Sequence, residues 1–168
     1  AATATTGLRI ITVWNQTGGS GKTTIATNLA YESARRGIRT LFIGLGAPDI
    51  APLYLGLNAT PNLTVWRANP IPQVLKQSIQ KTGDLDVLAG FPDVLAESQI
   101  LTSSPDAENS LSKLVMMAAY EGYACIVLDA PHSQVAALAL AASNTLILVA
   151  RPTLADAWCT VEAWRTLQ

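Results

Sequence analysis

Thr17-Gly18-Gly19-Ser20-Gly21-Lys22-Thr23-Thr24 is the stretch that decides the fold of this chain. It follows the apolar run Leu8–Trp14 and leads directly into a helical pattern over residues 22–37. Glycines let backbone N–H groups approach phosphate oxygens closely, and a helix N-terminus adds the positive end of its dipole. A glycine-rich loop between a strand and a helix therefore predicts a phosphate-binding P-loop.

The side chains of this loop suit a nucleoside triphosphate. Lys22 would neutralise the β and γ phosphates and is the predicted catalytic cation. The Thr23 hydroxyl would bind Mg²⁺, a hard cation that prefers oxygen ligands. We expect all eight residues, 17–24, to contact the nucleotide, with ATP and Mg²⁺ as the cofactors. A glycine-rich turn with an incidental lysine is the alternative, but the flanking strand and helix disfavour it.

The remaining sequence predicts an α/β protein. Of the 168 residues, 49% are apolar and only 14% are charged, which suits a sheet covered by helices. Near-continuous apolar runs predict parallel strands that are buried on both faces; they lie at Thr40–Ile43, Asp86–Ala89, Ala124–Leu128 and Thr145–Ala150. Helical patterns fall between them, at residues 70–81, 107–121, 132–143 and 153–168. The alternation predicts a doubly wound, mostly parallel sheet with helices on both faces, the P-loop NTPase fold.

Two stretches lack a clear period. Residues 47–72 contain several prolines and are expected to form a short helix and loops, and residues 91–106 are expected to be similar. The chain starts without Met and stops at Gln168 inside a helical pattern. We therefore expect a single P-loop ATPase domain over residues 1–168 that is truncated at its C-terminal end.

Composition narrows the classes of partner. The formal net charge of −1 argues against a dedicated nucleic-acid surface, so DNA is an unexpected partner although a local basic patch stays open. Cys125 and Cys159 lack the spacing of a zinc site or a disulfide framework. No apolar run reaches the roughly 18 residues that span a bilayer. We expect a cytoplasmic protein that meets a membrane only through segments outside this sequence.

Several segments resemble the ParA/MinD family of ATPases. Asn15–Thr24 is similar to the deviant Walker A P-loop of that family, with Gln16 where an ordinary P-loop has its first glycine. Tyr123–Pro131 resembles the Walker B strand, whose terminal aspartate, here Asp129, supports magnesium. Thr145–Ala150 with the following Arg151-Pro152-Thr153-Leu154 resembles the family's next strand and loop, and this segment is most similar to the CpaE/TadZ subgroup, which localises pilus-assembly machinery.

The resemblance implies a Mg-ATP switch that positions a cellular structure: a pilus or secretion apparatus, a septum or a DNA cargo. It also implies a protein partner or a homodimer. Asp129 has a physical argument of its own, because a carboxylate at the end of an apolar strand must be solvated, paired or close to a metal. An ordinary turn carboxylate before Pro131 is the alternative.

The chain departs from the family pattern at two catalytic positions. Thr17 stands where the family has a signature lysine that reaches the partner subunit's phosphates, which puts nucleotide-dependent dimerisation in doubt. Gly44-Leu45-Gly46 stands where the family usually has Asp-x-Asp, and glycine can neither accept a proton nor orient water. Asp49 lies close by and could either replace the missing acid or be merely solvated. We therefore expect hydrolysis to be weak or absent.

Two other functions stay open at this point. One is a degenerate scaffold that does not hydrolyse ATP and acts through protein contacts alone. The other is a P-loop kinase for a small molecule, which would need an acceptor-binding acid or lid arginines, and none stands out in the sequence. The sequence does not decide whether the chain is an active ATPase.

Overall fold

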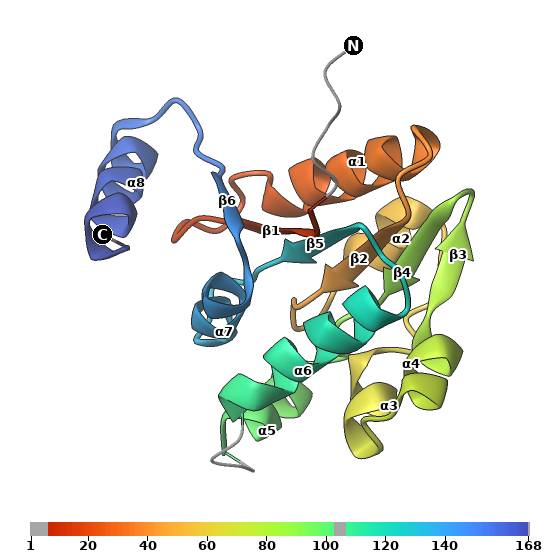
Figure 1. The fold of residues 1–168 in the computed structure, drawn as a ribbon. Coiled ribbons are helices and arrows are strands. Elements are labelled where there is room, and N and C mark those ends of the chain that lie inside the picture. The colour runs from red at the N-terminus through yellow and green to blue at the C-terminus, as the bar shows by residue number, and fades with distance from the viewer. Residues whose placement is uncertain (1–6, 103–106, 168) are drawn as a thin grey trace.

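Six strands form one sheet at the centre of the structure, in the order β3-β4-β2-β5-β1-β6 (Figure 1). This is a computed structural model, and it describes residues 7–102 and 107–167. All neighbouring strands are parallel except β3, which runs antiparallel to β4. The strands are β1 (Arg9–Trp14), β2 (Thr40–Gly44), β3 (Gln80–Thr82), β4 (Leu85–Leu88), β5 (Cys125–Asp129) and β6 (Thr145–Leu148).

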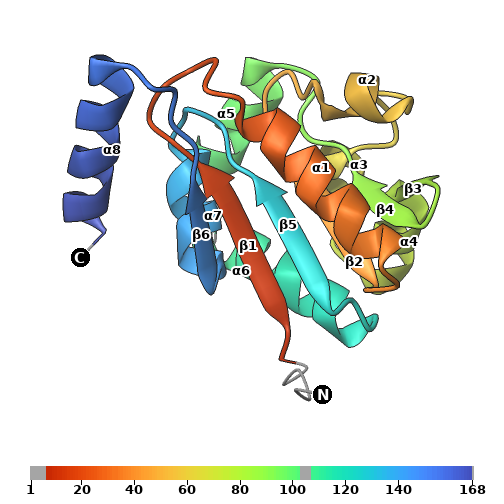
Figure 2. The same ribbon diagram turned by 90° about the horizontal axis from the view of Figure 1, so that it is seen from above.

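Helices cover both faces of this sheet (Figures 1 and 2). One face packs against α1 (Lys22–Arg35) and α2 (Ala51–Leu55), with the alanines of α1 in the core. The other face packs against helices that include α6 and α7, through residues such as Leu114 and Ala139. This group comprises α3 (Leu63–Ala68), α4 (Pro72–Ser78), α5 (Val94–Thr102), α6 (Ala107–Tyr120) and α7 (Val135–Ala142). The predicted doubly wound α/β fold is confirmed.

The C-terminal helix, α8 (Leu154–Thr166), lies beyond the β6 edge of the sheet (Figure 2). Its side chains are mostly exposed, and they include Trp158 and Trp164. In the ranges that the structure describes, no helix is long and apolar enough to cross a membrane.

Two sequence predictions of local structure differ from the structure. The helix expected over 70–81 ends at Ser78, and the chain then forms β3, which pairs with β4 through a turn at Gly83 with φ 56°. The stretch 47–72 holds two short helices, α2 and α3, rather than one. The stretch 91–106 contains the expected short helix, α5, which begins where the Asp93 carboxylate accepts the N–H of Ala96 at 2.8 Å.

Tertiary packing explains why short helices form where the sequence shows no clear period. Trp66 of α3 is only 2% exposed and packs with residues of α6 and of the sheet. Such burial stabilises a helix too short to be stable alone. This contribution is invisible to a search for helical periodicity.

We expect Trp66→Ala to lower the free energy of unfolding by about 3–5 kcal/mol, because it removes a large side chain from a packed core. Chemical denaturation measures this change. Trp158→Ala is the matched control, because Trp158 is 66% exposed; its cost should stay within about 0.5 kcal/mol. Equal effects of the two substitutions would contradict the packing described for α3.

Candidate functional site

The glycine-rich loop joins the end of β1, which lies between β5 and the edge strand β6, to the start of α1. Gly19 and Gly21 have φ values of 68° and 93°, the left-handed region that favours glycine. Gly21 is the N-cap of α1, so the first N–H groups of that helix open toward the loop. Backbone N–H groups and the helix dipole therefore converge where an anion would sit.

Lys22 folds back over this loop. Its ammonium Nζ donates to the carbonyl oxygen of Thr17 at 2.7 Å. Burial lowers the pKa of Lys22, while the nearby carboxylates of Asp129 and Asp156 act in the opposite direction. The Lys22 ammonium is thus a partly desolvated cation that a backbone carbonyl group of the loop holds in place.

Asp129 ends β5 and is buried beside the loop. Its carboxylate accepts a hydrogen bond from the Thr23 hydroxyl. Burial raises the pKa of Asp129 to about 6, and the bond from Thr23 and the charge of Lys22 partly offset this rise. A hydroxyl and a carboxylate side by side form an oxygen donor set that fits Mg²⁺, which uses one or two such groups together with phosphates and water.

These groups share one cavity of about 230 Å³. Lys22 and Thr23 line one side and Asp129 another, while the loop after β2, including Gly46 and Asp49, completes the wall. In a mostly parallel sheet, ligands bind at the carboxyl ends of the strands, and this cavity lies at those of β1, β2 and β5.

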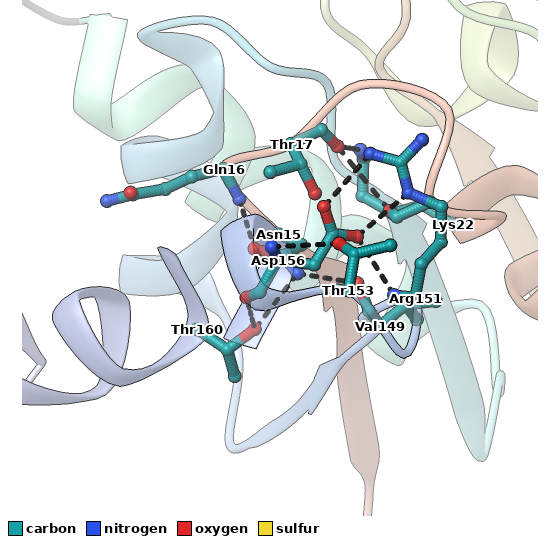
Figure 3. A network of polar contacts seen from close by, with 10 residues as sticks. Asn15, Gln16, Thr17, Lys22, Val149, Arg151, Thr153, Asp156 and Thr160 are labelled. Carbon is teal, nitrogen blue, oxygen red and sulfur yellow. Dashed lines mark hydrogen bonds and ion pairs between the residues drawn. The ribbon is translucent and has the colours of Figure 1, made fainter. Parts of the chain in front are cut away.

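A second group of side chains fastens the start of α8 to the loop (Figure 3). The carboxylate of Asp156 is fully buried and accepts three N–H bonds from Arg151, one from the backbone at 2.9 Å and two from the guanidinium at 3.0 and 2.9 Å. This pairing holds the pKa of Asp156 well below its usual range, and the nearby Thr17 hydroxyl adds to the effect. The Thr153 hydroxyl accepts the N–H of Asp156 at 3.2 Å and caps the helix.

Asn15 extends this network to the end of β6. Its amide donates to the carbonyl oxygen of Val149 at 2.6 Å and to the Thr160 hydroxyl at 3.2 Å (Figure 3). The P-loop is therefore positioned from both sides, by β1 and α1 along the chain and by α8 across it. Sequence reasoning missed the roles of Arg151 and Asp156, although an acid in the first turn of a helix, after a Thr cap, was a signal for them.

The structure gathers the predicted site residues at one place. Residues 17–21 form the loop, residues 22–24 form the first turn of α1, and Thr23 contacts Asp129. The Thr17 side chain faces Asp156, and its carbonyl oxygen receives Lys22. Gly44 and Gly46 bring no carboxylate to the cavity, whereas Asp49 does. The binding roles assigned to these residues stay predictions.

Comparison with known proteins identifies the family. A family profile described as an AAA domain matches residues 8–155. The chromosome-partitioning ATPase Soj of Thermus thermophilus is 32% identical over 127 residues, which are 75% of this chain and 47% of Soj. The chain belongs to the ParA/MinD family of P-loop ATPases.

Solved structures of this fold superpose closely on the chain. A ParA family ATPase from Chlorobium tepidum gives a TM-score of 0.78 at 20% identity and covers 94% of this chain and 67% of its own. Cobyrinic acid a,c-diamide synthase from Mycobacterium smegmatis, with bound ADP and magnesium, gives 0.76 at 23% identity over 95% of this chain and 66% of its own. These likenesses show the fold. The matched part of this chain spans about half of the length of Soj, 47%.

We expect Asp129→Asn to stabilise the protein at pH 7 in the absence of nucleotide and metal. An acid whose pKa rises on folding, here to about 6, binds its proton more tightly in the folded state, so it makes the free energy of unfolding fall between about pH 4 and 6. Asparagine removes this fall and should add up to about 3 kcal/mol at pH 7.

Chemical denaturation in EDTA between pH 4 and 7 measures the effect. Asp84→Asn makes the same substitution in an exposed turn and is the control; it should change the free energy of unfolding at pH 7 by less than about 0.5 kcal/mol. An Asp129→Asn protein that is no more stable than the wild type at pH 7 would contradict the burial argument.

Proposed function

We propose that this chain is a Mg-ATP-dependent switch of the ParA/MinD type, whose nucleotide state controls its contacts with a protein partner or a second copy. The observation that carries the proposal is the shared cavity of Lys22, Thr23 and Asp129 at the carboxyl edge of the sheet. An ammonium and convergent N–H groups suit the phosphates, and the two oxygen donors suit Mg²⁺.

Mg²⁺ would supply charge neutralisation between the β and γ phosphates. Thr23 would be its protein ligand, and Asp129 would hold the Thr23 hydroxyl and the waters around the ion. The likeness to a synthase structure with bound ADP and magnesium supports this cofactor pair. The deviant Walker A form of the loop is part of the proposal, and it rests on residues 15–24.

The proposed output is the positioning of a cellular structure. Soj carries the name of a chromosome-partitioning ATPase, which supports a positioning role. The resemblance of residues 145–154 to CpaE/TadZ proteins favours a pilus or secretion apparatus over a septum or DNA cargo. The basic pair Arg35 and Arg36 forms ion pairs with Glu32, so these arginines lend little support to a DNA surface.

Hydrolysis is proposed to be slow or absent. Thr17 supplies no cation to a partner's phosphates, and Gly44 and Gly46 supply no acid. A scaffold that keeps bound nucleotide without cleaving it is the second candidate, and these same three residues favour it. A small-molecule kinase has weaker support, because the match to Soj favours a partitioning ATPase.

We expect Lys22→Ala to weaken binding of a fluorescent ATP analogue with Mg²⁺ by at least about tenfold, because the phosphates lose a partly desolvated cation. Fluorescence titration measures the dissociation constant. Lys113→Ala is the control, since Lys113 is exposed on α6, away from the cavity. Absence of saturable binding by the wild type, or equal binding by Lys22→Ala, would sink the proposal.

We expect Thr23→Val to reduce the gain in nucleotide affinity that Mg²⁺ brings, because valine keeps the volume but loses the metal-binding hydroxyl. Titrations of the analogue with Mg²⁺ and with EDTA measure this gain. Binding in EDTA should change by less than about threefold. The metal assignment fails if Mg²⁺ improves affinity equally in Thr23→Val and in the wild type.

A further inference from the structure

Two glycines make room for the side chain of Asp49 at the end of β2. A Cβ atom on Gly44 would lie 2.0 Å from Oδ2 and 2.7 Å from Cγ of Asp49. A Cβ atom on Gly90 would lie 2.9 Å from the Cβ of Asp49. These separations are too short for real atoms, so the Asp49 carboxylate occupies the space that a side chain at position 44 would fill.

Backbone groups hold the Asp49 carboxylate in this position. The N–H of Gly90 donates to Oδ2 at 2.7 Å, and the N–H of Ala51 donates to Oδ1 at 3.0 Å. The N–H of Asp49 itself donates to the carbonyl oxygen of Phe91 at 3.0 Å. A carboxylate has about four lone-pair sites, so two N–H bonds leave acceptor capacity for water.

Asp49 faces the same cavity as the predicted metal and phosphate groups. It lines the wall with Lys22, Thr23 and Asp129. Gly44, whose space it fills, pairs in register with Asp129 on the neighbouring strand. The negative charge of Asp49 also contributes to the raised pKa of Asp129, as expected for two carboxylates that are close together.

We propose that Asp49 is the carboxylate that orients the attacking water when ATP is cleaved in this cavity. The water oxygen forms a bond to the γ-phosphorus, and the bond from that phosphorus to the β–γ bridging oxygen breaks. ADP keeps the electron pair of the broken bond. Asp49 accepts the proton that the water loses and releases it to solvent. The loop after β2 thereby supplies, through Asp49, the carboxylate that Gly44 at the end of β2 cannot supply.

This assignment rests on the proposed Mg-ATP function and makes it more specific. Glycine at position 44 is then required, because any side chain there would displace the Asp49 carboxylate. Gly44 and Asp49 form one arrangement in which the acid reaches the end of β2 from five residues downstream. Slow turnover is the expected activity, since Thr17 still supplies no cation in trans.

The test is single-turnover hydrolysis of ATP with Mg²⁺ by the wild type and by Asp49→Asn. We expect Asp49→Asn to bind the fluorescent ATP analogue within about threefold of the wild type and to hydrolyse ATP about 10²–10⁴-fold more slowly. Asp93→Asn is the matched control, because Asp93 also accepts a backbone N–H but lies outside the cavity lining. Its rate should equal that of the wild type.

A second pair of variants distinguishes a catalytic role of Asp49 from a role in folding the loop, because it moves the carboxylate from position 49 to position 44. Asp49→Ala vacates the space beside position 44, and adding Gly44→Asp returns a carboxylate there from the strand. The double variant should hydrolyse ATP at least about tenfold faster than Asp49→Ala alone. A folded double variant that recovers no hydrolysis overturns the proposal.

The remaining outcomes separate this inference from the proposed function. Wild-type hydrolysis by Asp49→Asn overturns the role of Asp49 and leaves nucleotide binding intact. A wild-type protein that binds Mg-ATP without cleaving it also overturns that role and supports the scaffold. Absence of any nucleotide binding by the wild type overturns the proposed function itself.

Discussion

The Lys22 ammonium and the buried Asp129 carboxylate line one cavity at the end of the sheet where the loop opens, and the site depends on the fold keeping these two groups close together. Each charge acts on the other: Asp129 opposes the lowered pKa of Lys22, and Lys22 opposes the raised pKa of Asp129. Both groups are partly removed from water, so neither is fully satisfied by this attraction alone. A phosphate would satisfy the cation and a metal ion would satisfy the carboxylate, and this complementarity supports the proposal that Mg-ATP binds in this cavity.

The fold supplies the geometry that keeps these charges together. β1 and β5 are adjacent, with Val13 in register with Asp129, so the loop after β1 starts beside the carboxylate. The Arg151–Asp156 pair fixes the segment before α8 to the first turn of that helix, and the bond from Asn15 to Thr160 joins α8 to the start of the loop. Because the guanidinium uses Nε and Nη2 on Asp156, it is locked by a planar, bidentate contact rather than by a mobile ion pair. The loop is thus supported from both sides.

The α/β class and the P-loop could be predicted from the sequence, because each depends on a local pattern. Gly18 to Thr24 lie in one continuous stretch, and apolar runs indicate buried strands directly. The contact of Thr23 with Asp129 joins residues far apart in the chain, and only the tertiary structure shows it. The strand β3 and the helix α3 could not be predicted, because they depend on pairing with β4 and on the burial of Trp66. Asp49 stayed undecided for a similar reason. The Asp49 side chain occupies the space that side chains at positions 44 and 90 would fill, and only the tertiary structure shows that these positions are close to Asp49.

The central claim is that the Lys22 loop receives the phosphates of Mg-ATP. A crystal structure with Mg²⁺ and a non-hydrolysable ATP analogue tests it most directly, through the partner of the Lys22 ammonium. We predict that Nζ leaves the Thr17 carbonyl oxygen and lies about 2.7–3.2 Å from phosphate oxygens. We also predict that Mg²⁺ lies about 2.0–2.1 Å from the Thr23 hydroxyl. An analogue bound elsewhere, or a Lys22 that stays on Thr17 while phosphates occupy the cavity, would contradict the account.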